Sequence, residues 1–297
     1  MFEIKNFNNW IIDTNGEFGS GASEKIWLVN PTTKEKGLFK FPKVKDEEKN
    51  IITGEYWAEK LAEKIGGLLD IRCSRIDMGT YNGRIGSMSY NFVKEDEKFD
   101  EGIIFIQSKY PYYSKKNLID NFSKMPYSVQ LIKNSIEKTI NFKDFLKVII
   151  FDALIGNSDR HHSNWGIITN VNGNKYLSPL YDNGSSLCSY EDENNVEVFF
   201  KDKLKYEALI NTKSKSAIGW KGKRPIRHFE LIQNIKDTYY KETIEFVEII
   251  KDRINEMSVN EILSNFENAM INESMKKLLL MFIMERKNRI LKIYGEM

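Results

Sequence analysis

The chain has 297 residues, of which 41% are hydrophobic and 29% are charged, and its formal net charge is +2. This composition is typical of a globular protein with one large domain or two lobes, and so small a net charge does not predict a nucleic-acid or membrane partner. Cys73 and Cys188 are too few for a disulfide framework or a cysteine metal site. No signal peptide or membrane-spanning run is visible, so we expect a cytoplasmic location, while secretion without a classical signal peptide stays open.

Residues 1–95 are expected to form a small N-lobe of strands with one helix. Asn82-Gly83 is a strong signal for a two-residue hairpin. Thr53 is a candidate cap for a helix with an apolar stripe. The expected elements are strands at 25–29 and 37–41, a helix at 53–65, and a hairpin of 71–81 with 84–92.

Residues 96–297 are expected to form a mostly helical C-lobe, joined to the N-lobe by the acidic stretch 94–101. The segment 142–156 is apolar on most faces, which is typical of a buried helix, and Gly156 is expected to end it. Weak periodicity predicts a long irregular loop at 183–223. Further expected elements are a short hairpin of 165–169 with 175–177, and helices from Pro225 to the end.

A polar loop follows the buried helix, with the sequence Asn157-Ser158-Asp159-Arg160-His161-His162-Ser163-Asn164. Phosphoryl transfer needs an Asp that orients the attacking hydroxyl, and an Asn and an Asp that hold Mg²⁺ on the phosphates. Asp159 and Asn164 can fill the first two roles. Asp182 follows the expected hairpin and can fill the third, because oxygen ligands suit Mg²⁺.

Each of these signals has a structural alternative. Taken alone, the loop is equally a polar turn whose side chains cap nearby backbone groups. Taken alone, Asp182 also fits a turn-starting residue before Asn183 and Gly184, which is a common arrangement. His161 and His162 are poor joint ligands of one metal, because adjacent side chains point apart.

The N-lobe offers a glycine-rich segment and a lysine for the same chemistry. Glycines allow backbone amides to approach phosphate oxygens closely, although a flexible hairpin tip is the plainer explanation. Lys40 shares one side of the sheet with Leu38 and needs an anionic partner there, unless it reaches out to solvent. We expect that partner to be Glu55, because Glu59 is expected on the solvent face of the helix. The candidate nucleotide-binding residues of the segment are Gly19, Ser20, Gly21, Ala22 and Ser23.

The order of these features is the order found in kinases: glycine segment, strand Lys, helix Glu, Asp-x₄-Asn loop, metal Asp. The sequence resembles the HipA-like serine/threonine kinases. Residues 157–164 fit that family's N-x-D-x-H-x-x-N catalytic loop, and residues 177–182 fit its L-x-P-L/A-Y-D metal segment. Residues 21–25, 38–42 and 54–58 resemble its phosphate loop, lysine strand and N-E-x-x-A helix start, with Gly54 in place of Asn.

The resemblance implies an α+β, two-lobed fold of the protein-kinase type. It implies transfer of the γ-phosphoryl group of ATP, with Mg²⁺, to a serine or threonine hydroxyl of a protein substrate. The hinge near adenine is implied at residues 88–92, mostly through backbone groups. The implied roles are base for Asp159, catalytic-loop partners for Asn157 and His161, Mg²⁺ ligands for Asn164 and Asp182, and nucleotide contacts for Lys40, Glu55, Tyr90 and Phe92.

The chain is most similar to the short, stand-alone members of this family. Longer members carry an extra N-terminal subdomain that contacts a DNA-binding antitoxin, and here the glycine segment starts almost at once. A toxin role and an antitoxin partner therefore stay open. Register from Gly21 puts Phe18 where some members carry an autophosphorylated serine, and Ser20 and Ser23 are the substitutes.

Residues 201–227 hold nine Lys or Arg against Asp202 and Glu207, which is a strong local positive patch. It predicts docking of an acidic protein surface, a phosphosite or a tRNA-bound target, and a solvated flexible loop is an equal alternative. Two other functions stay open: a lipid or small-molecule kinase, and a non-catalytic pseudokinase that serves as a binding module. The sequence does not identify the substrate, the autophosphorylation site or the oligomeric state.

Overall fold

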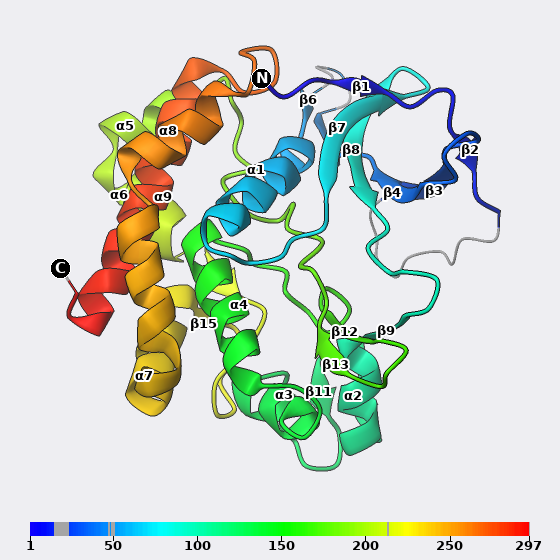
Figure 1. Cartoon of the computed structure of the whole chain (residues 1–297). Helices are drawn as coiled ribbons and strands as arrows, with labels where there is room; N and C mark the ends of the chain where they lie inside the picture. Colours follow the sequence, from blue (N-terminus) through cyan, green and yellow to red (C-terminus); the bar gives the residue numbers. More distant parts are fainter. Residues whose placement is uncertain (15–23, 47, 49–50, 213, 297) are drawn as a thin grey trace.

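The computed structural model describes residues 1–14, 24–46, 48, 51–212 and 214–296 and shows a mixed α+β fold (Figure 1). A curled six-stranded sheet lies at the upper right of Figure 1, and long helices fill its left side. Neighbouring strands of this sheet pair antiparallel, except β1 and β7, which are parallel. The strands in spatial order are β1 (Lys5–Asn6), β7 (Ile76–Tyr81), β8 (Arg84–Tyr90), β4 (Lys36–Lys40), β3 (Lys25–Val29) and β2 (Ile11–Ile12).

The turn of the β7–β8 hairpin is made by Asn82 and Gly83, as predicted. Their φ angles are 49° and 75°, and a two-residue turn of this kind needs positive φ at both positions, which Asn and Gly tolerate best. The first strand begins at Ile76 and not at residue 71. Strands β3 and β4 confirm the two strands predicted before the helix, to within one residue.

Helix α1 (Glu55–Leu68) packs beside β7 and β8 (Figure 1). The predicted cap is wrong: Gly54 is the N-cap, and the Thr53 hydroxyl instead donates to the Glu55 carboxylate at 2.6 Å. Apolar neighbours cover most sides of the helix, so Glu59, expected on a solvent face, is only 2% exposed. Glu59 is therefore available to partners inside the protein.

Helix α4 (Phe142–Ile155) crosses the centre of Figure 1 and packs against α7 and α9. It confirms the predicted buried helix, and Gly156 ends it with a left-handed φ of 71°. The remaining helices are α2 (Gly102–Lys109), α3 (Val129–Ile136), α5 (Glu197–Lys201), α6 (Lys203–Glu207), α7 (His228–Arg253), α8 (Glu256–Ser264) and α9 (Glu273–Tyr294).

The segment 183–223 was predicted to be an irregular loop, and this is wrong in part. It contains α5, α6, a π-helical turn at Ala208–Thr212 and strand β14. Helices of five residues cannot show a clear apolar period, which is why the sequence pattern missed them. The smaller sheets are β13 (Lys175–Leu177) with β12 (Gly166–Thr169) and β9 (Lys98–Glu101), β10 (Tyr113–Ser114) with β11 (Ile119–Asp120), β14 (Lys215–Ser216) with β15 (Ile226–Arg227), and β5 (Val44–Asp46) with β6 (Ile51–Ile52).

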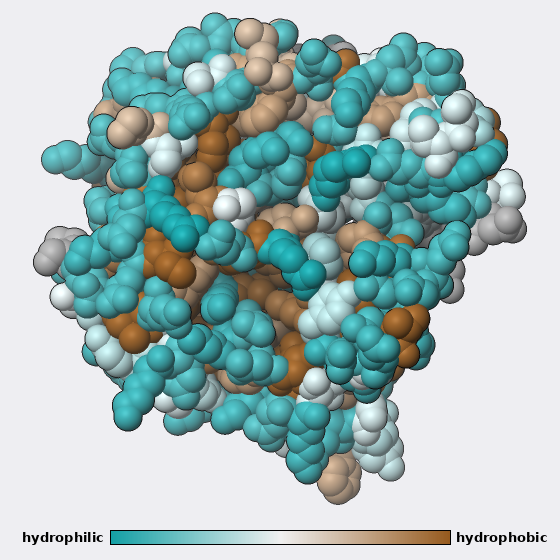
Figure 2. Space-filling view, in the orientation of Figure 1, coloured by the Kyte–Doolittle hydropathy of each residue, from teal (hydrophilic) through white to brown (hydrophobic). Residues whose placement is uncertain are grey.

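Two apolar cores stabilise the described residues. The smaller lies on the sheet around Phe39 and Met88, and the larger joins α1 to the C-terminal helices. Because α1 shares this larger core, the domain boundary near residue 95 stays a prediction. Cys73 and Cys188 are free thiols, and no described helix is long and apolar enough to cross a membrane. Figure 2 shows one face of the molecule, which is mostly hydrophilic with hydrophobic residues in small groups.

The end of α4 gives a first prediction. We expect Gly156→Ala to lower the free energy of unfolding by about 2–5 kcal/mol, because a left-handed Ala costs about 1–2 kcal/mol and overpacking adds about 1–3 kcal/mol. A methyl group at Gly156 would lie 2.8 Å from the Phe282 ring. The matched control is Gly173→Ala, with φ +77° and open space around it, which should lose only the backbone part. Equal losses in urea unfolding would contradict the packing argument.

Candidate active site

Arg160 holds the polar loop and the segment around Asp182 together from inside the protein. Its side chain is 1% exposed, and it donates to the Asp152 carboxylate on α4 through Nε at 3.0 Å and Nη2 at 2.8 Å. Its Nη1 donates to the carbonyls of Asn164 and Tyr181, at 2.8 Å each. Burial alone disfavours the charged guanidinium, but Asp152 more than offsets this and raises the pKa of Arg160.

Asp159 and Asn164 meet within the loop. The Asn164 side-chain amide donates to the Asp159 carbonyl at 2.7 Å, which leaves Asn164 Oδ1 without a hydrogen bond among the described residues. An amide oxygen in this state is a suitable ligand for a hard cation. Burial raises the pKa of Asp159, while His161 opposes this shift and Asp182 adds to it.

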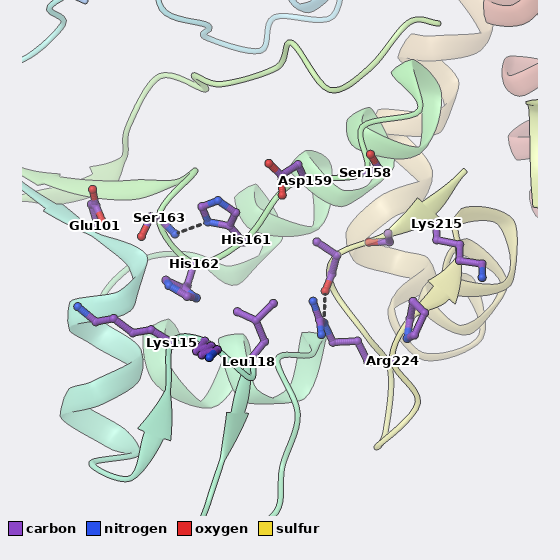
Figure 3. A pocket seen from close by; sticks show the side chains of 14 residues that line it. Glu101, Lys115, Leu118, Ser158, Asp159, His161, His162, Ser163, Lys215 and Arg224 are labelled. Carbon is purple, nitrogen blue, oxygen red and sulfur yellow. Dashed lines mark hydrogen bonds between the residues drawn. The ribbon is translucent and has the colours of Figure 1, made fainter. Parts of the chain in front are cut away.

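Asn157 and His161 hold different positions around Asp159. Asn157 is buried, donates to Asp152 at 3.0 Å and accepts the N–H of Asp159 at 3.0 Å, so it fixes the backbone of the loop. His161 Nδ1 accepts the N–H of Ser163 at 3.1 Å (Figure 3). This bond places the proton of a neutral His161 ring on Nε2.

Lys40, at the end of β4, lies between two carboxylates. Its Nζ is 2.9 Å from Asp182 Oδ1 and 3.0 Å from Glu59 Oε1. The other oxygen of Glu59 accepts the N–H of Asn183 at 3.0 Å. Burial alone would raise the pKa of Asp182, but Lys40, with smaller contributions from Lys25 and His161, lowers this pKa to about 2. Asp182 therefore stays ionised at neutral pH.

The predicted ion pair between Lys40 and Glu55 is wrong. Glu59, one helical turn further along α1, is the partner, whereas Glu55 accepts from the N–H of Lys43 at 3.0 Å and from the Tyr190 hydroxyl at 2.9 Å. The reason is the direction of α1: its first turn faces Lys43 and Tyr190, and its second turn faces the end of β4.

Asp182 and Asn164 have the chemistry of a Mg²⁺ site completed by a ligand. Among the described residues, no group of three His, Cys, Asp or Glu side chains could hold a metal. Mg²⁺ uses only one or two protein oxygens, with waters and substrate phosphates as its other ligands. Asp182 has a φ of 57°, and strained residues of this kind cluster at functional sites.

A cavity lies between the sheet and the segment around Asp182, and we call it the hinge cavity. It is lined by Lys40, Tyr90, Phe92, Asn164 and Asp182, among others, so the predicted nucleotide and metal residues of the described chain come together there, apart from Glu55.

Tyr90 and Phe92 of the predicted hinge both line this cavity. The Tyr90 hydroxyl donates a hydrogen bond to Asp77 at 2.9 Å. The backbone N–H of Tyr90 donates to the Arg75 carbonyl. The N–H of Phe92 makes no hydrogen bond with the described residues. The Phe92 ring stacks on Tyr181, with centroids 5.7 Å apart, which adds an aromatic wall to the cavity.

A second cavity, of about 580 Å³, lies beside Asp159, and we call it the base cavity (Figure 3). Glu101 and Ser163 line both cavities, so the two adjoin. In Figure 3, Asp159 lies on one side of the base cavity, and Lys115 and Arg224 lie on the other.

The sequence interpretation missed several of these residues. Asp152 carried a usable signal: an acid within an apolar helix needs a buried partner, and Arg160 stands eight residues later. Glu59 and Lys115 carried none, because their neighbours come from distant segments. The predicted phosphate-loop residues Gly19, Ser20, Gly21, Ala22 and Ser23 lie outside the described residues.

The buried pair gives a second prediction. We expect Arg160→Met to lower the free energy of unfolding by about 3–5 kcal/mol, because it leaves the Asp152 charge buried without a partner. The double variant Asp152→Leu/Arg160→Met should recover much of this loss, since it buries no charge. Urea unfolding of both variants tests the pair. A double variant no more stable than Arg160→Met would show that the hydrogen bonds to the loop, and not the charge, dominate.

Known proteins share this arrangement of elements. The model of the HipA-like C-terminal domain matches residues 19–261. The serine/threonine-protein kinase CtkA of Helicobacter pylori (strain J99) is 22% identical over 278 residues, which are 93% of this chain and 83% of CtkA. The putative kinase Y4dM of Sinorhizobium fredii is 34% identical over 71 residues, which are 24% of this chain and 17% of Y4dM.

Solved structures agree on the fold. The crystal structure of the Helicobacter pylori proinflammatory kinase CtkA superposes with a TM-score of 0.82 at 20% identity, over 98% of this chain and 96% of that one. HipA in the Shewanella oneidensis MR-1 complex of HipA, HipB and operator DNA superposes with a TM-score of 0.58 at 12% identity. The match covers 93% of this chain and 65% of the HipA chain. The predicted α+β, two-lobed kinase-like fold is therefore confirmed. With a family model that matches most of its length, the chain belongs to the family of the HipA-like C-terminal domain.

Proposed function

We propose that this chain is an ATP- and Mg²⁺-dependent serine/threonine protein kinase. The observation that carries the proposal is the junction of the two cavities at Glu101 and Ser163. Lys40 and Asp182 line the hinge cavity, and Asp159 lines the base cavity. Adjoining cavities would bring a bound phosphoryl donor next to an acceptor hydroxyl, as phosphoryl transfer requires.

Each residue has a role that follows from its contacts. Lys40, aimed by Glu59, is placed to hold phosphate oxygens, and the oxygens of Asn164 and Asp182 are placed to hold Mg²⁺. ATP supplies the γ-phosphoryl group, and Mg²⁺ neutralises charge on its phosphates. The Phe92 N–H is the hinge donor that we assign to adenine.

Asp159 is the base in this proposal. It orients the acceptor hydroxyl and accepts its proton, and it must be ionised to do so. Its pKa is raised by burial, so activity is expected to fall as the pH drops through that raised value. Asn157 acts through the Asp159 backbone and is a positioning residue. His161 lines the base cavity beside Asp159.

Partners follow from the relatives as proposals. CtkA is named a serine/threonine-protein kinase, which supports a protein as the acceptor. The Shewanella complex joins HipA to HipB and operator DNA in a toxin–antitoxin system, which supports a toxin role with an antitoxin as a further partner of this chain.

A labelling assay tests the function. With Mg²⁺ and γ-labelled ATP, we expect transfer to protein serine or threonine, either in the chain itself or in an added protein. Asp159→Asn should lower the rate by about 10²-fold or more, since general bases contribute about 10²–10⁴-fold. ATP should still raise the melting temperature of this variant, which is the control for folding. Label in an inositol lipid, or stabilisation by ATP without any transfer, would overturn the proposal.

The two glutamates of α1 give a matched pair of variants. Glu59→Gln should lower kcat/KM for ATP by about tenfold or more, which corresponds to a loss of about 1.4 kcal/mol, because Lys40 loses its second anionic partner. Glu55→Gln removes the same charge from the same helix but does not touch Lys40, so its effect should be smaller. A larger loss for Glu55→Gln would refute the assignment of Glu59.

A further inference from the structure

The base cavity carries more positive charge than a hydroxyl acceptor needs. Lys115 and Lys116, from the turn between β10 and β11, line it together with Lys215 of β14 and Arg224. These side chains come from two segments about 100 residues apart in the sequence. In Figure 3, Lys115 and Lys215 lie at opposite sides of the view, and Arg224 lies between them. The fold, and not a local run of charge, therefore assembles this cationic wall.

None of these four cations forms an ion pair within the described part of the chain. Arg224 is half-buried, and its Nε donates to the Ala217 carbonyl at 2.9 Å (Figure 3). This bond fixes the guanidinium and leaves its other nitrogens available to a ligand. His162 lines the same cavity, and its pKa is lowered most by burial and next by His161. The charges of Lys115 and Arg224 lower this pKa further. Like charges gathered in this way favour an anionic occupant.

We propose that the base cavity selects a polypeptide acceptor whose serine or threonine is flanked by an anionic side chain, a carboxylate or a phosphate. This proposal rests on the proposed kinase function. The acceptor hydroxyl lies at Asp159, and the flanking anion lies against Arg224, with Lys115 and Lys215 on either side of it. Leu118 and Pro225 supply apolar contacts for the peptide between them.

A peptide fits the observations better than a nucleic acid or a lipid surface. The net charge of the chain is only +2, so the chain lacks the strong overall positive charge that is typical of nucleic-acid binding. The cavity holds about 580 Å³, which suits a few side chains. Of the nine cations in residues 201–227, Lys215 and Arg224 line it.

The test compares four peptides that differ only beside one acceptor serine, which is flanked by Glu, phosphoserine, Gln or Lys. Two quantities are measured for each peptide: kcat/KM for phosphoryl transfer, and the affinity by fluorescence anisotropy. At low salt we expect both to favour the Glu and phosphoserine peptides over the Gln peptide by about tenfold or more, with the Lys peptide weakest. The preference should be smaller at high salt. Equal values for the Glu and Gln peptides would overturn the proposal.

Two double variants locate the effect. Lys115→Gln/Lys215→Gln removes two exposed lysines from the cavity and should bring the preference for Glu over Gln close to one. Lys203→Gln/Lys205→Gln removes two exposed lysines of α6 that line neither cavity, and it should keep the preference. Equal effects of the two variants would place the selectivity in the overall charge and overturn the site.

The two readouts separate this inference from the kinase function. Selective binding without transfer would refute the kinase proposal and retain the anion site. Transfer without selectivity would refute the anion site and retain the kinase. RNA, and phosphatidylcholine vesicles that contain phosphatidylinositol phosphate, are tested for binding beside the peptides. If either binds more tightly than the Glu peptide and loses that binding in Lys115→Gln/Lys215→Gln, the assignment of a peptide is overturned.

Discussion

The buried pair of Arg160 and Asp152 fixes the geometry on which the whole site depends. A guanidinium offers five donors in one rigid plane, and here they reach α4, the polar loop and the segment around Asp182 at once. Lysine would supply the charge but not this fork. Because an unpaired buried charge is costly, Arg160 and Asp152 are stable in the core only as a pair. The catalytic candidates are therefore positioned by the same interaction that closes the core beneath them.

Glu59 has the corresponding role between the sheet and the C-terminal elements. One of its oxygens holds Lys40 of β4, and the other holds the backbone of Asn183. A single carboxylate on α1 therefore sets the distance between the lysine and the candidate metal ligand Asp182. Tertiary packing places it there, since α1 is covered on most sides and Glu59 has no route to solvent.

The sequence predicts those parts of this protein that depend on local spacing. Asp159, Asn164 and Asp182 are brought together by a loop and a hairpin that both follow from nearby residues, and the helix ending at Gly156 follows from its own apolar run. The choice between Glu55 and Glu59 could not be predicted, because both lie on one side of the helix and only its packing angle separates them. The cationic wall of the base cavity could not be predicted either, since Lys115 and Lys215 line the same cavity only in the folded chain.

The left-handed backbone of Asp182 has a consequence for ligand affinity. Its neighbours are held on both sides, Tyr181 by Arg160 and Asn183 by Glu59, so the strained conformation cannot relax by local rotation. The conformational entropy of the Asp182 backbone is therefore lost when the chain folds, and the proposed binding of a cation would not cost it again. If Asp182 binds Mg²⁺ as proposed, substitutions at Arg160 or Glu59 would restore that freedom and weaken cation binding, although neither residue is a proposed metal ligand.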